Sequence, residues 1–241
     1  MKYKNDISFE VWGDYALFTD PMTKIGGEKC TYQIPTYEAL KGILASIYWK
    51  PTFIWYIDKV RIMNPIQMEV KGVRPLKYND SSKNDLSYYT YLKDCRYQVH
   101  AHFEWNENRP ELEDDRIEGK HFEIARRMVH KGGRRDIFLG SRECQGYVAP
   151  CTFGEGEGAY DNIPELGFGL MYHSITYADE AYSDETRDRM TRNLWLPMME
   201  AGVIKFLRPE KCPLHETIGV MQMKKFGKET DNFIGLKEEG L

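Results

Sequence analysis

The stretch EGKHFEIARRMVHKGGRRDIFLGSREC, from Glu118 to Cys144, places a lysine and a histidine side by side at Lys120 and His121. An imidazole, with an ordinary pKa of about 6.5, can take or give a proton near neutral pH. An ammonium group beside it can hold a phosphate oxygen. The pair therefore suits RNA cleavage, in which a 2′-hydroxyl loses a proton and the phosphate gains charge. The alternative, from these residues alone, is a histidine at the core edge beside a solvated lysine.

Basic residues gather around this pair although the chain of 241 residues has a formal net charge of −4. Cations are favoured near a helix C-terminus, which accounts for Arg126, Arg127 and Lys131 without any ligand. The arginines beyond Gly132 and Gly133 have no such explanation and indicate contact with phosphate. The residues predicted to contact RNA are Lys71, Arg74, Arg126, Arg127, Lys131, Arg134, Arg135 and Arg142.

A second group of candidate ligands is formed by His100, His102 and Glu104, which alternate along one stretch of chain. Side chains of these types on one strand face can hold zinc or manganese. The same spacing is that of the polar face of a half-buried strand, and we favour this interpretation. The sequence contains no phosphate-loop, kinase or dinucleotide-binding motif. We expect neither a metal nor a cofactor.

The elements expected to position these residues begin with a strand at Ile7–Val11, where apolar and polar residues alternate. Thr36 is expected to cap a helix that ends before Pro51 and keeps Tyr48 and Trp49 in its last turn. Its apolar stripe, at steps of three and four residues, is expected to consist of Tyr37, Leu40, Ile43, Leu44 and Ile47. The stretch TFIWYIDKVRIM then predicts a strand, and MEVKGVRPLKYNDSSKNDLSYY predicts a loop-like segment with NDSSKND as its most mobile part.

The clearest periodicity lies at positions 95–105, where the odd positions are apolar and the even ones polar. This alternation predicts a strand with one face in the core. A helix is expected to open at Arg109-Pro110 with the acidic run that follows, because acids are favoured in a first turn, and to stop at Gly132-Gly133. Its apolar stripe is expected to consist of Ile117, His121, Ile124 and Met128. The stretches DIFLG and GYVAPCTF predict further strands.

This order of elements, β-α-β-β-α-β, predicts an α+β fold with a ferredoxin-like (RRM-like) unit. Beyond Gly154, the stretch LMYHSITY predicts a strand, and MTRNLWLPMMEAGVIKFLRP predicts a hairpin that turns at Glu200-Ala201-Gly202. We expect a domain at residues 1–140 that holds the catalytic residues, and a small antiparallel β domain at residues 141–241. The last residues, GKETDNFIGLKEEGL, are expected to be frayed.

Composition is that of an ordinary globular protein, with 41% hydrophobic and 29% charged residues. No stretch approaches the roughly 20 apolar residues that cross a bilayer, and no secretory leader is recognisable. The five cysteines are scattered and fit no common zinc motif, so reduced thiols are expected. These features predict a cytoplasmic protein without membrane partners.

Several long stretches together resemble one known family: GDYALFTDPMTKIGGEK, PTYEALKGILASIYWKPTF, PIQMEVKGVRP, EGKHFEIARRMVHKGGRRDIFLGSRECQGYVAPC and RPEKCP. They are similar to the d branch of the fifth CRISPR-associated protein family, found in subtype I-C (Dvulg) systems. The likeness extends to about Pro213. It implies membership of the RAMP superfamily, with a ferredoxin-like N-terminal unit and a smaller antiparallel β part.

The resemblance also implies an activity. Members of this family cut precursor CRISPR RNA at the base of the repeat hairpin without a metal, and leave 5′-hydroxyl and 2′,3′-cyclic phosphate ends. Their catalytic tyrosine, lysine and histidine fall on Tyr48, Lys120 and His121 of this sequence. Implied partners are precursor and mature CRISPR RNA, the backbone and large subunits of the type I-C effector complex, and, through that complex, target DNA.

Two other functions are compatible with the sequence. One is a non-catalytic subunit that only binds the 5′ handle of the mature RNA, as in related subtypes; the presence of Tyr48, Lys120 and His121 argues against it. The other is a metal-dependent DNA nuclease, as a side activity. Its only support is the polar face formed by His100, His102 and Glu104.

Overall fold

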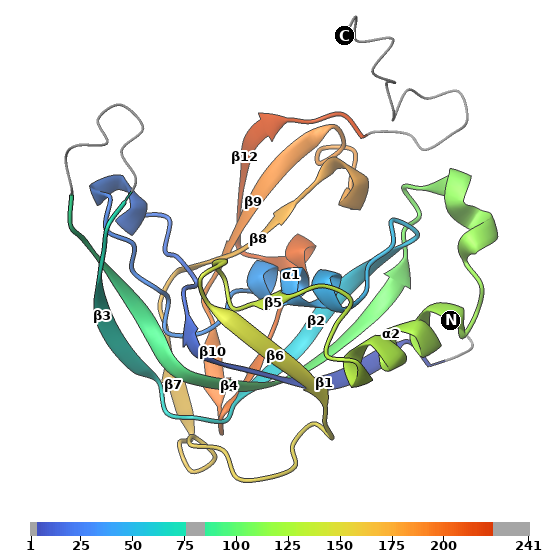
Figure 1. The fold of residues 1–241 in the computed structure, drawn as a ribbon. Coiled ribbons are helices and arrows are strands. Elements are labelled where there is room, and N and C mark those ends of the chain that lie inside the picture. The colour runs from blue at the N-terminus through green and yellow to red at the C-terminus, as the bar shows by residue number, and fades with distance from the viewer. Residues whose placement is uncertain (1–3, 76–84, 224–241) are drawn as a thin grey trace, which may run out of the picture.

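Two antiparallel β-sheets and two α-helices make up the computed structural model, which describes residues 4–75 and 85–223 (Figure 1). The expected combination of helices with mostly antiparallel sheets is therefore confirmed. Nearly all of the NDSSKND stretch and the tail from Gly227 lie outside the described residues. Among the described residues, no helix combines the length and apolar character needed to cross a bilayer.

The larger sheet contains the six strands up to Pro150 together with three short strands from the last third of the chain. Its spatial order is β5-β6-β1-β4-β2-β11-β10-β7, and β3 pairs with the first part of β4. The strands are β1 (Asp6–Ala16), β2 (Phe53–Ile62), β3 (Gln67–Val73), β4 (Ser87–Trp105), β5 (Ile137–Phe138), β6 (Gln145–Pro150), β7 (Glu165–Gly167), β10 (Met198–Glu200) and β11 (Val203–Lys205).

The smaller sheet has the order β12-β9-β8. Its strands are β8 (Met171–Thr176), β9 (Arg189–Trp195) and β12 (Leu214–Val220). Four short 3₁₀ helices lie in the connections: η1 (Thr23–Gly26), η2 (Pro110–Asp115), η3 (Ala178–Glu180) and η4 (Pro209–Lys211).

The first helix, α1 (Tyr37–Ile47), forms where the sequence predicts it. The Thr36 hydroxyl accepts a hydrogen bond from the Ala39 N–H at 3.1 Å, which satisfies one free donor of the first turn. The apolar positions of the predicted stripe are buried. Tyr48 differs from the expectation: its backbone is extended (φ −161°, ψ 129°), so it is the C-cap residue and lies just beyond the last turn.

The predicted alternation in β4 is also confirmed. Cys95, Tyr97, Val99, Ala101 and Phe103 are buried, and their strand neighbours on β1 and β2 complete the same apolar layer. Both helices pack on the large sheet, α1 against β2 and α2 (Lys120–His130) against β1 and β6. The core therefore lies between the helices and this face of the sheet.

The second helix begins ten residues later than its expected start. The acidic run forms η2, and Gly119 then adopts a left-handed conformation (φ 77°) immediately before α2. Ile117 is 51% exposed and takes no part in the stripe. The fully buried face of α2 consists of His121, Ala125 and Val129, at steps of four residues. Ile124 and Met128 are partly buried and pack against the core, as expected. The expected stripe was wrong at Ile117 because it assumed one continuous helix.

Two further expectations need correction. The segment expected to be loop-like contains β3, which forms a hairpin with the first part of β4. The hairpin at Glu200-Ala201-Gly202 exists, and Ala201 and Gly202 both have positive φ, as its tight turn requires. Its strands, however, join β2 in the large sheet and not the small one. β6 also pairs with β1. The division at residue 140 stays a prediction.

We predict that Gly140→Ala destabilises this fold strongly, because Gly140 has φ +92° and an added Cβ would lie 2.2 Å from the Leu17 carbonyl oxygen. The expected loss is about 2–3 kcal/mol of unfolding free energy, measured by urea denaturation. Gly26→Ala is the matched control, since nothing lies within 4 Å of its added Cβ. Equal stabilities of the two variants would contradict the prediction.

Candidate active site at the ends of the two helices

The structure brings a phenol and an imidazole into contact at the end of α1 and the start of α2. The Tyr48 hydroxyl lies 2.9 Å from His121 Nδ1. The Tyr48 backbone is fixed on both sides: its N–H donates to the Leu44 carbonyl at 2.8 Å, and its carbonyl accepts from Trp55 Nε1 at 2.8 Å. Both side chains are buried, with 3% of Tyr48 and 0% of His121 exposed.

The hydrogen bonds of His121 define its tautomer. Nε2 lies 2.7 Å from the backbone carbonyl oxygen of Asp115, which can only accept a hydrogen bond, so Nε2 carries a proton. In the neutral ring, Nδ1 is then the acceptor and the Tyr48 hydroxyl the donor. Phe53 and Trp105 pack edge-on to the imidazole. This burial lowers the pKa of His121, against the opposing effect of Asp115, and keeps the ring neutral.

The phenol also stays protonated near neutral pH. Burial raises the pKa of Tyr48 to about 12, with a further increase from the Asp115 charge. Arg134 acts in the opposite direction, which places its charge within electrostatic reach of the phenol. Tyr48 is therefore a hydrogen-bond donor to His121, as the tautomer requires. The two groups form a linked pair through which a proton can pass.

Lys120 is held beside the Tyr48–His121 pair by the carboxylate of Asp115. Its Nζ lies 2.5 Å from Asp115 Oδ1, and Thr52 Oγ1 donates to Asp115 Oδ2 at 2.7 Å. Partial burial acts to raise the pKa of Asp115, but the hydrogen bonds from Lys120 and Thr52 lower it overall. The Lys120 side chain is 39% exposed, in contrast to the buried His121. The ammonium is therefore the member of the group that solvent reaches.

The basic residues of α2 fall on two different flanks of the helix. Arg127 and Lys131 follow Lys120 at steps of seven and four residues, which places them on the same flank. Arg126 lies on another flank and pairs with Glu123 at 2.8 Å. The structure thus separates two neighbours that the sequence analysis had grouped together.

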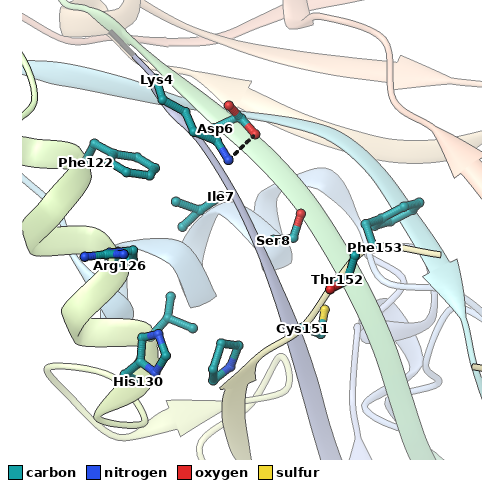
Figure 2. A pocket seen from close by; sticks show the side chains of 12 residues that line it. Lys4, Asp6, Ile7, Ser8, Phe122, Arg126, His130, Cys151, Thr152 and Phe153 are labelled. Carbon is teal, nitrogen blue, oxygen red and sulfur yellow. Dashed lines mark ion pairs between the residues drawn. The ribbon is translucent and has the colours of Figure 1, made fainter. Parts of the chain in front are cut away.

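Arg126 lines a hollow on its flank. Phe122, Arg126 and His130 form one wall, and β1 and the residues after β6 form the other (Figure 2). The hollow has a volume of about 340 Å³. Tyr48, Lys120 and His121 do not line it.

Arg134 and Arg135 lie beside the end of α1. Their backbone N–H groups both donate to the Ser46 carbonyl, at 3.1 and 3.0 Å, so the chain crosses from the end of α2 to the end of α1 at this point. Two residues of the predicted basic group therefore lie near Tyr48. Arg142 is exposed in the turn between β5 and β6.

Lys71 and Arg74 lie elsewhere. Lys71 is on β3, opposite Tyr89 in β4, and its Nζ lies 3.1 Å from the centroid of the Tyr15 ring. Trp105, which packs on His121, is the last residue of β4, at the opposite end of that strand. Arg74 follows the end of β3. These two residues do not share a surface with Lys120.

The polar face of His100, His102 and Glu104 is occupied by protein contacts. His102 Nδ1 lies 2.8 Å from Asp58, and Glu104 is paired with Arg208. His100 Nδ1 lies 2.9 Å from the Ser8 hydroxyl. Within residues 4–75 and 85–223, no three His, Cys, Asp or Glu side chains are grouped as metal ligands.

Three residues near the candidate site were missed by the sequence analysis. Asp115 was assigned only to a helix-opening acidic run, and Thr52 was part of an apolar strand. Trp49 follows Tyr48 and is 46% exposed, which makes it available to stack on a base. The only signal for Asp115 was its position five residues before Lys120, and for Trp49 its place beside Tyr48.

Comparison with known proteins identifies the family. The protein-family model Cas_Cas5d, described as CRISPR-associated protein (Cas_Cas5), matches residues 6–207. A Thermus thermophilus protein named CRISPR pre-crRNA endoribonuclease Cas5d is 31% identical over 184 residues, covering 72% of this chain and 75% of that relative. A Mannheimia succiniciproducens protein of the same name is 45% identical over 65 residues, which span 27% of this chain and 28% of that relative.

A solved structure supports the same conclusion. A crystal structure described as a CRISPR-associated protein has a TM-score of 0.74 and 34% sequence identity, and covers 89% of this chain and 97% of that one. The family model covers the strands and helices that form the Tyr48–His121 contact. The chain therefore belongs to the Cas5d family of CRISPR-associated proteins.

Proposed function

We propose that this protein is an endoribonuclease that cuts precursor CRISPR RNA within the repeat hairpin and then stays on the 5′ handle of the mature RNA. The observation that carries the proposal is the contact between the Tyr48 hydroxyl and His121 Nδ1, with Lys120 adjacent. The names of the two curated relatives, both pre-crRNA endoribonucleases, support the same reaction.

The reaction follows from the groups present and needs no metal. The 2′-hydroxyl loses its proton and its oxygen forms a bond to the adjacent phosphorus, while the bond to the 5′-oxygen breaks. The departing 5′-oxygen takes up a proton, which leaves 5′-hydroxyl and 2′,3′-cyclic phosphate ends. The linked Tyr48–His121 pair transfers the protons. Lys120 stabilises the added charge on the phosphate.

A second candidate is a subunit that binds the 5′ handle without cutting it. The observation that favours it is the complete burial of His121, whose ring nitrogens are both paired within the protein. Cleavage by Tyr48 and His121 requires that RNA binding open this site. The cleavage assay below distinguishes the two candidates.

The remaining parts of the proposal concern fold and partners. The spatial order β6-β1-β4-β2, with α1 and α2 as the crossings, supports a ferredoxin-like unit. The proposed partners are the backbone and large subunits of a type I-C effector complex and, through it, target DNA. The five free cysteines fit the reducing cytoplasm that the proposal assumes.

We predict that the purified protein cuts repeat RNA in EDTA, and that a 2′-deoxy substitution at the scissile nucleotide removes cutting while RNA binding persists. His121→Ala should lower the single-turnover rate by about 10²–10⁴-fold, as loss of proton transfer does. Lys120→Ala should lower it by about 10²–10³-fold through lost charge stabilisation. Tyr48→Phe, which removes only the hydroxyl, should also lower it.

Matched surface variants control for general effects. Lys205→Ala removes a lysine that is 75% exposed on β11, and His215→Ala removes an exposed histidine on β12. Both should cut at the wild-type rate. Intact RNA in the wild-type reaction, with binding retained, would favour the non-catalytic candidate.

The pH dependence of cleavage should show the lowered pKa of His121. Because burial disfavours the imidazolium, His121 of the RNA-free protein stays neutral below its ordinary pKa of about 6.5. The acid limb of the kcat/KM profile, which reports the free enzyme, should therefore lie below that pH. His102 is the internal control, since its hydrogen bond to Asp58 raises its pKa. NMR titration of the two ring signals checks both directions. A titration midpoint of His121 at or above pH 6.5 would contradict the lowered pKa.

Arg134→Ala/Arg135→Ala should weaken RNA binding and reduce its salt dependence. Loss of two phosphate contacts on a single strand lowers the slope of log K against log salt by about 1.4. Lys71→Ala/Arg74→Ala tests the separate proposed contact at β3 in the same assay. Arg187→Ala/Lys205→Ala, two exposed cations away from α1 and α2, is the charge-matched control. A slope unchanged by the first pair would exclude its contact with phosphate.

A further inference from the structure

We propose that Lys120, Thr52 and His121 form a binding site for a phosphate oxyanion, and that the side chain of Asp115 occupies this site in the RNA-free protein. In this proposal, an RNA phosphate replaces the Asp115 carboxylate. Its biological ligand rests on the proposed function, whereas the site itself can be tested with inorganic phosphate alone.

The donors around the Asp115 carboxylate are those that bind phosphates. Lys120 Nζ lies 2.5 Å from Oδ1, and Thr52 Oγ1 lies 2.7 Å from Oδ2. His121 Nε2, which carries a proton, lies 3.6 Å from Oδ2. An ammonium and a hydroxyl thus bind the carboxylate oxygens, and an imidazole N–H lies beside them, with its own hydrogen bond to the Asp115 backbone carbonyl. A phosphate presents oxygens of the same acceptor type, with more negative charge.

The burial of these groups gives the site a closed floor and an open side. Thr52 is 2% exposed and His121 is 0% exposed. The side chains of Lys120 and Asp115 are 39% and 30% exposed. An anion from solvent can therefore reach the position of the carboxylate without entering the core. A partly exposed ion pair such as Lys120–Asp115 is also weak and can be exchanged for another.

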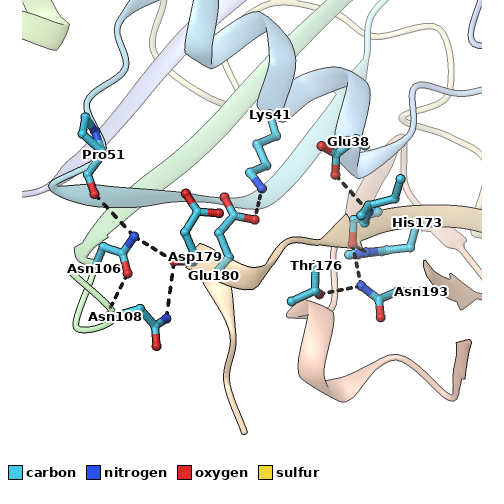
Figure 3. A network of polar contacts seen from close by, with 12 residues as sticks. Glu38, Lys41, Pro51, Asn106, Asn108, His173, Thr176, Asp179, Glu180 and Asn193 are labelled. Atoms are coloured by element: carbon cyan, nitrogen blue, oxygen red, sulfur yellow. Dashed lines mark hydrogen bonds and ion pairs between the residues drawn. The ribbon is translucent and has the colours of Figure 1, made fainter. Parts of the chain in front are cut away.

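The chain around Asp115 is held by contacts on both sides. At the start of the connection, Asn106 and Asn108 both donate to the Asp179 carbonyl (Figure 3), and Asn108 also donates to the Ala181 carbonyl. On the other side, Arg116 donates to the Asn106 carbonyl at 2.9 Å, and the Ile117 N–H donates to the Asp115 carbonyl at 2.8 Å. The chain then passes through Gly119 in a left-handed conformation before α2. The carboxylate can leave by side-chain rotation while these anchors hold.

A small shift of the Asp115 backbone has a second effect. The same residue supplies the carbonyl that accepts from His121 Nε2. When Asp115 moves, its carboxylate frees Lys120 and its carbonyl frees the His121 N–H. One residue therefore masks two of the groups that the proposed reaction requires, and one displacement exposes both.

The test measures the binding of inorganic phosphate to the full chain. Phosphate binding is followed by the NMR shifts of His121 and by calorimetry. Asp115→Ala should bind phosphate about tenfold more tightly than the wild type, because the competing internal anion is gone. Asp114→Ala is the control: it removes one negative charge from the exposed neighbour in the same 3₁₀ helix and should leave phosphate binding at the wild-type level. Adding Lys120→Ala to Asp115→Ala should abolish the gain.

Equal phosphate affinity in the wild type and Asp115→Ala would overturn the proposal, as would a gain that persists without Lys120. If Asp115→Ala unfolds, Asp115→Asn keeps the side-chain volume and should show a smaller gain in the same direction. RNA cleavage is scored separately. If Asp115→Ala gains phosphate affinity but no variant cuts RNA, the anion site is retained and the nuclease proposal is rejected. If the protein cuts RNA but Asp115→Ala gains no phosphate affinity, the nuclease proposal is retained and the anion site is rejected.

Discussion

The buried imidazole of His121 is the constraint on which the candidate site depends. A buried polar atom left without a partner costs about 1–3 kcal/mol, and the two ring nitrogens of His121 both need partners. Each is paired by a different part of the chain, Nδ1 by the end of α1 and Nε2 by the end of η2. The ring also packs between Phe53 and Trp105 from neighbouring strands. The positions of α1, η2 and the adjacent ends of β2 and β4 are therefore fixed relative to α2 by one side chain.

Local sequence patterns predicted the elements that hold this ring. Thr36 and the three- and four-residue steps predicted α1, and the strict alternation from Cys95 to Trp105 predicted the buried face of β4. Both signals are local, because capping and side-chain alternation depend on adjacent residues. The site is less local. Lys120 and His121 stand out as neighbours in the sequence, but Tyr48 was selected only through the family resemblance. Nothing in the spacing of Tyr48 and His121 predicts their contact.

The partner of the β10–β11 hairpin and the site residues missed in the sequence depend on pairings between distant segments. Asp115 and Thr52 are ordinary residues in sequence, and their role exists only because the end of η2 lies against the start of β2. The β10–β11 hairpin was predicted correctly, but its partner strand β2 lies more than a hundred residues earlier. Arg126 and Arg127 are adjacent in the chain, yet helical geometry directs them to different flanks. A pattern of apolar and charged residues does not contain this information.

The closed state of the site connects RNA recognition with cleavage. If Asp115 holds the position of the phosphate, a polyanion must compete with a carboxylate that is already covalently part of the protein. A short or incorrect RNA with few contacts to Arg134, Arg135 and the flank formed by Arg127 and Lys131 gains too little binding energy to displace it. A repeat that makes these contacts can use part of that energy to open the site, which raises specificity at some cost in affinity. In the proposed mechanism, the basic residues that bind RNA and the buried Tyr48–His121 pair are then two parts of one requirement, since the charges that bind RNA also determine when His121 becomes accessible.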